Sequence, residues 1–397
     1  MKNLKENPFG KFNGNEQKYA IQALDSTLSH EKSFNLKFEE SFAKKFGCKY
    51  AIAVNSGTSG LHAAVYAAGM NPGDEVIGPG LTVVMDAWAM IHLGATPVFA
   101  DVKKDTMTID PEDIERKISN KTKAIIVVSL QGLSVDMDPI MEIAKKHNLI
   151  VIEDSAQTVL GTYKGRLAGT IGDINVFSFE NKKHMTCGSE GGMIVTNNEE
   201  LAVRARKFAG LGYKHMTATA GRTSLAMSTV QDPNYERFDT VGLNYRLNEI
   251  SAAVGLAQLE RIDEIVRKRV MCANYFDNAL KDCSFMTPQR VPNCCDHSHY
   301  TYTVKYHGEE VTGLTWKDFY NHYIKMGGDG FYGACKVPYL EPAFHGLEVN
   351  GVRYESGLCP IAEEIQPQIM QFKTNYRDLE IAKEKASILN KLINEIS

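Results

Sequence analysis

The sequence predicts an α/β protein in which a mostly parallel sheet lies between helices, followed by a smaller C-terminal α+β domain. Short apolar runs alternate with segments of helical periodicity from residue 50 to residue 152. Strands joined by crossover helices form parallel sheets that are covered on both faces. A long amphipathic run at 247–270 then precedes a tail of mixed pattern. We therefore expect an N-terminal arm and large domain at 1–262 and a small domain at 263–397.

The elements of the large domain follow from the spacing of its apolar residues. Apolar side chains recur every three or four positions at 15–29 and again before Gly47, which predicts two N-terminal helices. Short apolar runs predict five strands, at 50–54, 75–78, 97–102, 124–128 and 149–152. Helices are expected between them, at 59–68, 85–93, 111–118 and 139–147.

The C-terminal half has a different pattern. Residues 211–240 are polar and lack periodicity, so we expect a long loop, and loops of that length often carry function. The run at 247–270 has one apolar face throughout and predicts one helix that links the two domains. Beyond it, we expect a strand at 300–306 and helices at 316–326 and 376–396.

Composition and charge exclude several classes of protein. The 397 residues are 43% hydrophobic and 23% charged, which is typical of a globular protein. The net charge of −4 gives no reason to expect nucleic acid or an anionic membrane as a partner. No apolar run approaches the roughly 20 residues of a membrane helix, and the polar start does not resemble a signal peptide.

The eight cysteines indicate a reducing environment. They are scattered and form no CxxC pair, and a chain of this size does not need disulfides. We therefore expect free thiols and a cytoplasmic protein. Zinc sites need two well-separated pairs of ligands. The group Cys294, Cys295, His297 and His299 lacks that spacing, so no metal site is expected.

Two adjacent lysines, Lys182 and Lys183, occupy the stretch FSFENKKHMTCGSEGG at 177–192. Most lysines are solvated surface charges. A buried lysine loses hydration, its pKa falls, and its free amine becomes a nucleophile and a proton carrier. In a strand-like run the two side chains would face opposite sides, so we expect only one of them to enter a site.

The sequence SGTSG at 56–60 stands between a predicted strand and a predicted helix. A helix N-terminus offers unpaired N–H groups and a partial positive charge, so it binds phosphate well. Gly57 and Gly60 would allow close approach of the backbone, and Thr58 and Ser59 would add hydroxyl groups. A simple N-cap turn needs the same residue types and no ligand. On this motif alone, both interpretations stay open.

Two further motifs place charged or amide side chains near the predicted ligand-binding edge. Asp154 follows the strand at 149–152, and an acid there could pair with a protonated ring nitrogen or cap the next segment. Asn244 and Arg246 open the predicted linking helix. They could cap the helix and pair with an acid, or they could face a phosphate or a substrate.

In this order, the motifs resemble those of the DegT/DnrJ family of pyridoxal-phosphate enzymes, the sugar aminotransferases of fold type I. Each motif alone is weak, but the set is specific and the resemblance covers nearly the whole chain. The family pattern has Asn-Ser-Gly-Thr, Glu-Asp-x-Ala-Gln/His, Ser-Phe-x-x-x-Lys with a later Glu-Gly-Gly, and Asn-x-Arg-Met/Leu. These occur here at 55–58, 153–157, 178–183 with 190–192, and 244–247.

The resemblance implies a seven-stranded sheet in a large domain that binds pyridoxal 5'-phosphate. Lys183 would hold the cofactor as an imine and shuttle protons, Asp154 would keep the pyridine nitrogen protonated, and Gln157 would contact the ring hydroxyl. The resemblance also implies a homodimer with shared active sites. The residues expected at the cofactor phosphate are Gly57, Thr58, Ser59 and Ser178, with Asn244 of the second subunit.

Three features depart from the family pattern. Val83 stands where the family usually has an aromatic ring that stacks on the cofactor. The stretch KHMTCGSE is one residue longer than the common form, with the extra residue near Ser189, and the 211–240 loop is unusually long. We expect these changes to alter substrate contacts rather than cofactor chemistry. The candidate substrate-binding residues are Val83, Arg246 and His184, which stands beside the lysine and could position the site or simply pack against it.

Three functions are compatible with these residues. The leading one is transamination from an amino acid, with glutamate implied by the family, to a keto sugar that is linked to a nucleotide. The acceptor could also be a cyclitol ketone or a phosphorylated ketose. The second is a sugar dehydratase of the same family, but those members replace the lysine with histidine. The third is a cofactor-binding regulator without activity, and the sequence holds no DNA-binding extension.

Overall fold

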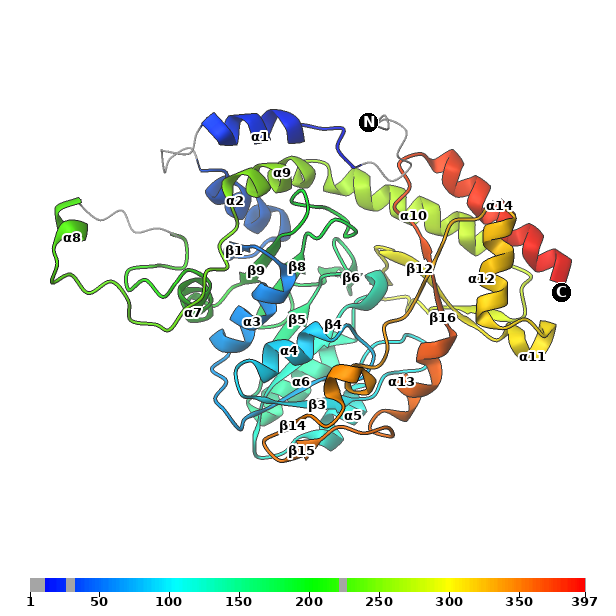
Figure 1. Cartoon of the computed structure of the whole chain (residues 1–397), viewed down its shortest axis with the longest axis horizontal. Helices are drawn as coiled ribbons and strands as arrows, with labels where there is room; N and C mark the ends of the chain where they lie inside the picture. Colours follow the sequence, from blue (N-terminus) through cyan, green and yellow to red (C-terminus); the bar gives the residue numbers. More distant parts are fainter. Residues whose placement is uncertain (1–10, 26–32, 221–226, 397) are drawn as a thin grey trace.

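The computed structural model of the 397-residue chain describes residues 11–25, 33–220 and 227–396. The polar start of the chain, part of the first predicted helix and part of the predicted 211–240 loop lie outside the described residues. Figure 1 shows a body built around one large sheet, with a second, smaller sheet beside the C-terminal helices.

The large sheet has seven strands in the order β1-β9-β8-β5-β4-β2-β3, as the family resemblance implied. The strands β8, β5, β4, β2 and β3 are mutually parallel, and β9 is antiparallel to both of its neighbours, β1 and β8. Their bounds are Tyr50–Val54 (β1), Glu75–Pro79 (β2), Thr96–Ala100 (β3), Thr122–Val128 (β4), Ile150–Asp154 (β5), Ile174–Ser178 (β8) and Gly192–Thr196 (β9). The predicted fold class is confirmed.

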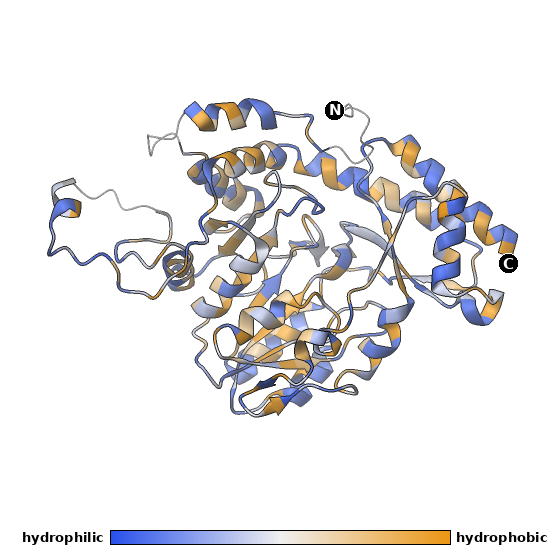
Figure 2. Ribbon diagram, in the orientation of Figure 1, coloured by the Kyte–Doolittle hydropathy of each residue, from blue (hydrophilic) through white to orange (hydrophobic). Residues whose placement is uncertain are grey.

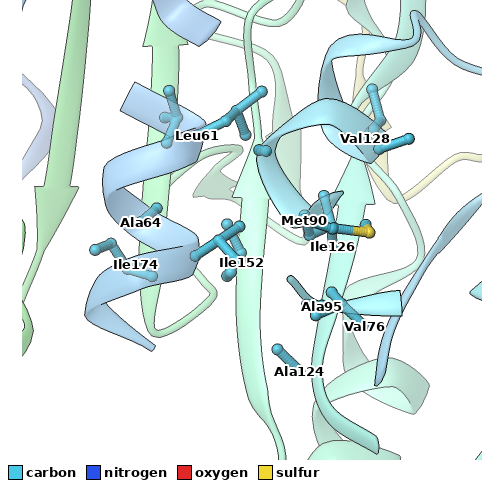
Figure 3. Packing of buried hydrophobic residues seen from close by; sticks show 14 of the residues in the cluster. Leu61, Ala64, Val76, Met90, Ala95, Ala124, Ile126, Val128, Ile152 and Ile174 are labelled. Carbon is cyan, nitrogen blue, oxygen red and sulfur yellow. The ribbon is translucent and has the colours of Figure 1, made fainter. Parts of the chain in front are cut away.

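Helices cover both faces of this sheet because alternate residues of its strands point to opposite sides. One face is packed by α3 (Gly57–Ala67), α4 (Met85–Ile91) and α7 (Glu199–Ala209). Figure 3 shows Leu61 and Ala64 of α3 facing Ile152 and Ile174 of the strands. The other face is packed by α5 (Pro111–Lys117) and α6 (Met137–His147).

The second sheet has four strands in the order β10-β12-β16-β13. An aromatic core joins it to the long C-terminal helices; Phe276 of α10 stacks on Phe372 of β16 with ring centroids 5.4 Å apart. The bounds are Met286–Pro288 (β10), Thr301–Tyr306 (β12), Tyr332–Gly333 (β13), Ile369–Lys373 (β16), Gly308–Thr312 (α11), Trp316–Lys325 (α12) and Leu379–Ile396 (α14).

Part of the C-terminal segment returns to the large sheet. Phe344 stacks on Trp88 of α4 with centroids 5.1 Å apart, and Ala362 of α13 (Pro360–Ile365) belongs to the same apolar core. The division of the chain at residue 262 stays a prediction. The remaining short strands are β6 (Thr162–Tyr163), β7 (Arg166–Leu167), β11 (Cys295–Asp296), β14 (Glu348–Val349) and β15 (Val352–Arg353).

Helices α1 (Glu16–Asp25), α2 (Phe34–Phe46) and α9 (Glu249–Leu259) pack together at one end of the large sheet (Figure 1). The hydropathy colouring of Figure 2 shows that these helices are amphipathic, with apolar and polar residues in alternating bands. Beneath them, Phe38 and Phe42 of α2 contact Phe177 and Phe179 around the end of β8. This aromatic layer supports the start of the lysine stretch.

The predicted linking helix is wrong in two respects. It is two helices, α9 and α10 (Ile262–Ala279), because Arg261 leaves helical geometry at φ −117°. It also begins at Glu249 rather than Leu247, after a cap in which the Asn248 side chain accepts a hydrogen bond from the Ser251 N–H (2.8 Å). The apolar period continues across the break, because both helices bury one face, so the sequence pattern could not reveal it.

The predicted loop at 211–240 is also not free of structure. It contains the short helix α8 (Met227–Gln231), and Tyr213 pairs with Phe238 in an isolated bridge. Five residues are too few to show a helical period. In Figure 1, α8 lies away from the body of the molecule. The other predicted strands and helices are confirmed, with ends that shift by up to three residues within the described ranges.

A buried ion pair ties α2 to α7. The two terminal guanidinium nitrogens of Arg206, Nη1 and Nη2, donate to the Glu39 carboxylate (3.1 and 2.9 Å), and Glu39 also accepts from the Ala53 N–H of β1. Arg206 further donates to the carbonyl oxygens of Ala51 and Ala218. Both charged side chains are less than 10% exposed. Removing either one would therefore leave the other charge buried without an ionic partner.

We expect Arg206→Met to lower the free energy of unfolding by about 3–5 kcal/mol, the usual cost of breaking a buried pair. Urea denaturation would measure it. The matched control is Lys45→Ala, which removes an ion pair to Asp263, a residue with 71% of its side chain exposed. That control should cost less than about 1 kcal/mol. Equal losses in the two variants would contradict the assigned role of the Glu39–Arg206 pair.

Candidate active site

The predicted site residues gather at the carboxyl ends of the parallel strands. Asp154 is the last residue of β5, Ser178 is the last of β8, and α3 begins directly after β1. Strands β1, β5 and β8 share one direction, since β1 and β8 both run against β9. Their carboxyl ends therefore meet at one edge of the sheet, where α/β proteins bind ligands.

The structure distinguishes the two adjacent lysines. Lys183 is half-buried, and its Nζ lies 5.0 Å from the centre of the Tyr300 ring. Lys182 is exposed, and its Nζ lies over Tyr332 instead. The two lysines lie in a turn after β8 rather than in an extended strand, so the expectation that they face opposite sides of a strand was wrong. The choice of Lys183, which came from its spacing after Ser178 in the family pattern, is supported by its burial and stays a prediction.

The surroundings of Lys183 favour its uncharged form. Burial lowers the pKa of the Lys183 amine, and the positive charge of Arg269 adds to this effect. The carboxylates of Asp154 and Glu180 oppose it. A lowered pKa increases the share of neutral amine at a given pH, and the neutral amine is the form that can attack a carbonyl or accept a proton.

Two basic side chains hold the backbone of the lysine loop. Lys11, from the N-terminal segment, donates from Nζ to the carbonyl oxygens of Asn181 and Lys183 (both 2.5 Å). The buried Arg269 of α10 donates to the carbonyl oxygens of Lys182 (3.3 Å) and Lys183 (3.1 Å). Burial lowers the pKa of Lys11 to about 7. These contacts fix the loop from the side of α10.

The start of α3 is pressed against the end of β8. A Cβ added to Gly57 would lie 2.8 Å from the Cβ of Ser178, so only glycine permits this approach. Thr58 is exposed, whereas Ser59 is buried and forms a capping box with Ser56. The Ser59 hydroxyl also donates to the Asn55 side chain (2.5 Å). It is therefore already engaged in the turn, which weakens its predicted part in phosphate binding.

Asp154 is buried, and its Oδ1 accepts a hydrogen bond from the Ala156 N–H (2.8 Å). Burial raises the pKa of Asp154, while the charge of Lys183 lowers it. Gln157 lies just beyond, and its Oε1 accepts from the Gln131 N–H (2.9 Å). Gln131 has a positive φ of 61°, so the loop after β4 bends sharply at this point.

The three predicted substrate contacts lie in different surroundings. Val83 is half-buried just before α4. His184 is completely buried, with Nε2 bonded to the Ser298 carbonyl oxygen (3.0 Å), and burial holds its pKa well below the usual range. Arg246 is exposed and donates from Nε to Asn244 Oδ1 (3.0 Å). The geometry favours a packing role for His184, and the substrate roles of all three stay predictions.

The sequence predicted that residues 244–246 open a helix. In the structure they instead run extended beside the SGTSG turn. Arg246 forms an isolated bridge with Val54, and the Asn55 N–H donates to the Tyr245 carbonyl oxygen (2.8 Å). Asn244 is exposed. The extra residue of the lysine stretch lies in an exposed turn at 188–190, in which Gly188 has φ +100°.

Sequence reasoning missed four residues of this site. Lys11, Arg269 and Tyr300 come from distant parts of the chain, and nothing in their local sequence marks them. Asp86 was missed although a signal exists, because it is the one acid in the apolar run VVMDAWAMI. The Asp86 carboxyl is buried and faces Asp154.

A model of the DegT/DnrJ/EryC1/StrS aminotransferase family matches residues 11–375. The chain belongs to this family. It is 41% identical over 298 residues to a GDP-perosamine synthase of Caulobacter vibrioides, covering 74% of this chain and 75% of the relative. It is 43% identical over 267 residues to a GDP-perosamine synthase of Escherichia coli, covering 67% and 68%.

A solved aminotransferase structure from Psychrobacter cryohalolentis agrees with this assignment. Its TM-score is 0.85 at 30% identity, and the match covers 97% of this chain and 98% of that one. The chain is therefore an enzyme of the aminotransferase class with the fold of that family.

All eight cysteines are free thiols, as expected.

Two further findings concern metals and membranes. Among the residues that the structure describes, no three His, Cys, Asp or Glu side chains are grouped so that they could hold a metal ion. None of the helices in the described ranges has the length and apolar composition of a membrane span.

Because its pKa is lowered, the Lys183 amine should react with an acylating reagent at lower pH than an ordinary lysine, even without the cofactor. A lysine is unreactive while protonated, so a lower pKa moves the rise in reactivity to lower pH. We expect acetic anhydride to label Lys183 in the Lys182→Arg variant with a midpoint below the ordinary lysine value of about 10.4. Mass spectrometry would follow the labelling. In urea-unfolded protein the shift should vanish, and a midpoint at or above the ordinary value in the folded protein would contradict the assignment.

Proposed function

We propose that this aminotransferase uses pyridoxal 5'-phosphate to move an amino group from an amino acid, with L-glutamate as the expected donor, to a nucleotide-linked keto sugar. The observation that carries the proposal is the half-buried Lys183, which faces Asp154 across the carboxyl edge of the sheet. Two relatives named as GDP-perosamine synthases, at 41% and 43% identity, support the substrate class.

The residues at this edge fit the chemistry of the cofactor. The N-terminus of α3, with Thr58 and Ser178, suits a phosphate group. Asp154 offers a carboxylate to a protonated ring nitrogen, and Gln157 offers an amide to a ring hydroxyl. Buried oxygens of Ser155 and Gln131, which have no partner among the described residues, leave polar atoms for a ligand to satisfy.

When bound, pyridoxal phosphate supplies a carbonyl that accepts an amino group and a ring that stabilises negative charge on the neighbouring carbon. The chain supplies the base. Lys183 can take a proton as a neutral amine and return it as an ammonium ion, because its pKa is lowered by burial. Lys11 and Arg269 fix the backbone of its loop, so the amine works from a defined position.

The acceptor follows from the relatives' product. An amino sugar made by transamination must derive from the sugar that carries a ketone at the same carbon. The expected acceptor is therefore the GDP-linked keto sugar that corresponds to GDP-perosamine. We further infer a homodimer, because Asn244 and the neighbouring apolar Val241 (92% exposed) and Leu243 (41% exposed) suit an interface rather than open solvent. The eight free thiols support a cytoplasmic location.

The dehydratase alternative is less well supported. In the dehydratases that the family resemblance suggests, histidine replaces the lysine. Here the position holds Lys183, and the neighbouring His184 is completely buried with its ring bonded to Ser298. His184 therefore cannot take over the role of the lysine without leaving its packing site.

The proposal is tested by incubating the protein with pyridoxal phosphate, L-glutamate and the GDP-linked keto sugar, and following the product by mass spectrometry. We expect an amino sugar from the wild type and from Lys182→Ala. Lys183→Ala should lose at least about 10²-fold in rate, because the proton carrier is gone.

Three results would contradict the proposal. Formation of product by Lys183→Ala at the wild-type rate would remove the lysine from the mechanism. Loss of a hydroxyl group without amination would indicate the dehydratase. Cofactor binding without any reaction with an amino donor would indicate a regulator.

A further inference from the structure

Asp86 is a buried acid that the proposed function does not use. It lies in the first turn of α4 and is 2% exposed. Carboxylates are almost never buried without a partner, because the loss of hydration costs too much. The main influences on the pKa of Asp86 are its burial and the charge of Asp154, which raise it, and hydrogen bonds from Thr82 and from its own backbone, which lower it. Its burial therefore needs another explanation.

The hydrogen bonds of Asp86 leave one oxygen without a conventional donor. Thr82 Oγ1 donates to Asp86 Oδ2 (2.8 Å). No N–H or O–H group in the described part of the chain donates to Oδ1. The group that the carboxyl faces is Asp154, because each of these two buried acids influences the pKa of the other. Two ionised carboxylates can only accept, so a hydrogen bond between them requires one proton.

The surroundings decide which acid carries the proton. Asp154 accepts the Ala156 N–H and faces Lys183, and both this hydrogen bond and the charge of the lysine in its protonated form stabilise the ionised form of Asp154. For Asp86, hydrogen bonds from the Thr82 hydroxyl and from its own backbone oppose the effects of burial and of the Asp154 charge, but they do not outweigh them. Burial raises the pKa of Asp86 well above its ordinary value, and the neighbouring Asp154 charge raises it further.

We propose that Asp86 is a positioning residue: its neutral carboxylic acid donates a hydrogen bond to Asp154 and holds that carboxylate, ionised and oriented, for the cationic ring nitrogen of the cofactor. The part of this inference that concerns the cofactor rests on the proposed function. The shared proton does not, because it belongs to the protein alone.

A simpler role for Asp86 makes the opposite prediction. An acid in the first turn of a helix is stabilised by the helix dipole, and α4 has no side-chain cap of its own. That role needs an ionised Asp86, because only the charge interacts with the dipole. The protonation state of Asp86 therefore separates the two explanations.

The first experiment is infrared spectroscopy of cofactor-free protein at neutral pH, with aspartate labelled by ¹³C at the carboxyl group. We expect the carbonyl band of a protonated aspartic acid in the wild type and its loss in Asp86→Asn. Thr82→Val is the matched control and should keep the band. The Thr82 hydrogen bond stabilises the ionised form of Asp86, so its loss leaves the protonated form favoured. A wild-type spectrum without an acid band, or one unchanged by Asp86→Asn, would overturn the proposal.

The second experiment measures the affinity of each variant for pyridoxal phosphate. Asp86→Asn keeps an N–H donor toward Asp154 and should bind nearly as well as the wild type. Asp86→Ala loses the donor and should bind about tenfold more weakly or worse. Equal affinity of the two variants would overturn the positioning role.

If the wild type bound no pyridoxal phosphate, the proposed function would fail. The infrared result on the cofactor-free protein would still decide whether Asp86 holds the proton. Failure of the positioning inference and failure of the proposed function are therefore distinguishable.

Discussion

A lysine amine withdrawn from water beside a buried acid is the constraint on which the rest of this structure depends. Under the proposed function, part of the Lys183 population must be uncharged, and Asp154 must stay ionised although it is buried. Each group offsets part of the cost of burying the other. The pair must also be held apart, since a closed ion pair would leave neither group available to a ligand.

The fold meets this constraint through its sheet. Asp154 and Ser178 sit at the carboxyl ends of adjacent parallel strands, and the first turn of α3 is close enough to Ser178 that only Gly57 fits between them. The lysine loop leaves the end of β8 and is held on its outer side by Lys11 and Arg269. Rigid strand ends therefore position Asp154 and Ser178, and two basic side chains position the loop that carries Lys183.

Much of the fold and part of the site could be predicted from the sequence, for separate physical reasons. Strand and helix periods are local, so the alternation from β1 to β5 was predictable, whereas the break at Arg261 was not, because the apolar face continues across it. The choice of Lys183 came from its spacing after Ser178. Lys11 and Arg269 act through backbone carbonyl groups of a distant loop, and such contacts leave no pattern in their own sequence.

The most direct test of this account locates the attachment of the cofactor. The protein is incubated with pyridoxal phosphate, reduced with borohydride to make any imine permanent, digested and mapped by fragmentation mass spectrometry. The account predicts a pyridoxyl group on Lys183 and none on Lys182. Modification of Lys182, or of a lysine outside the loop with Lys183 left intact, would contradict it.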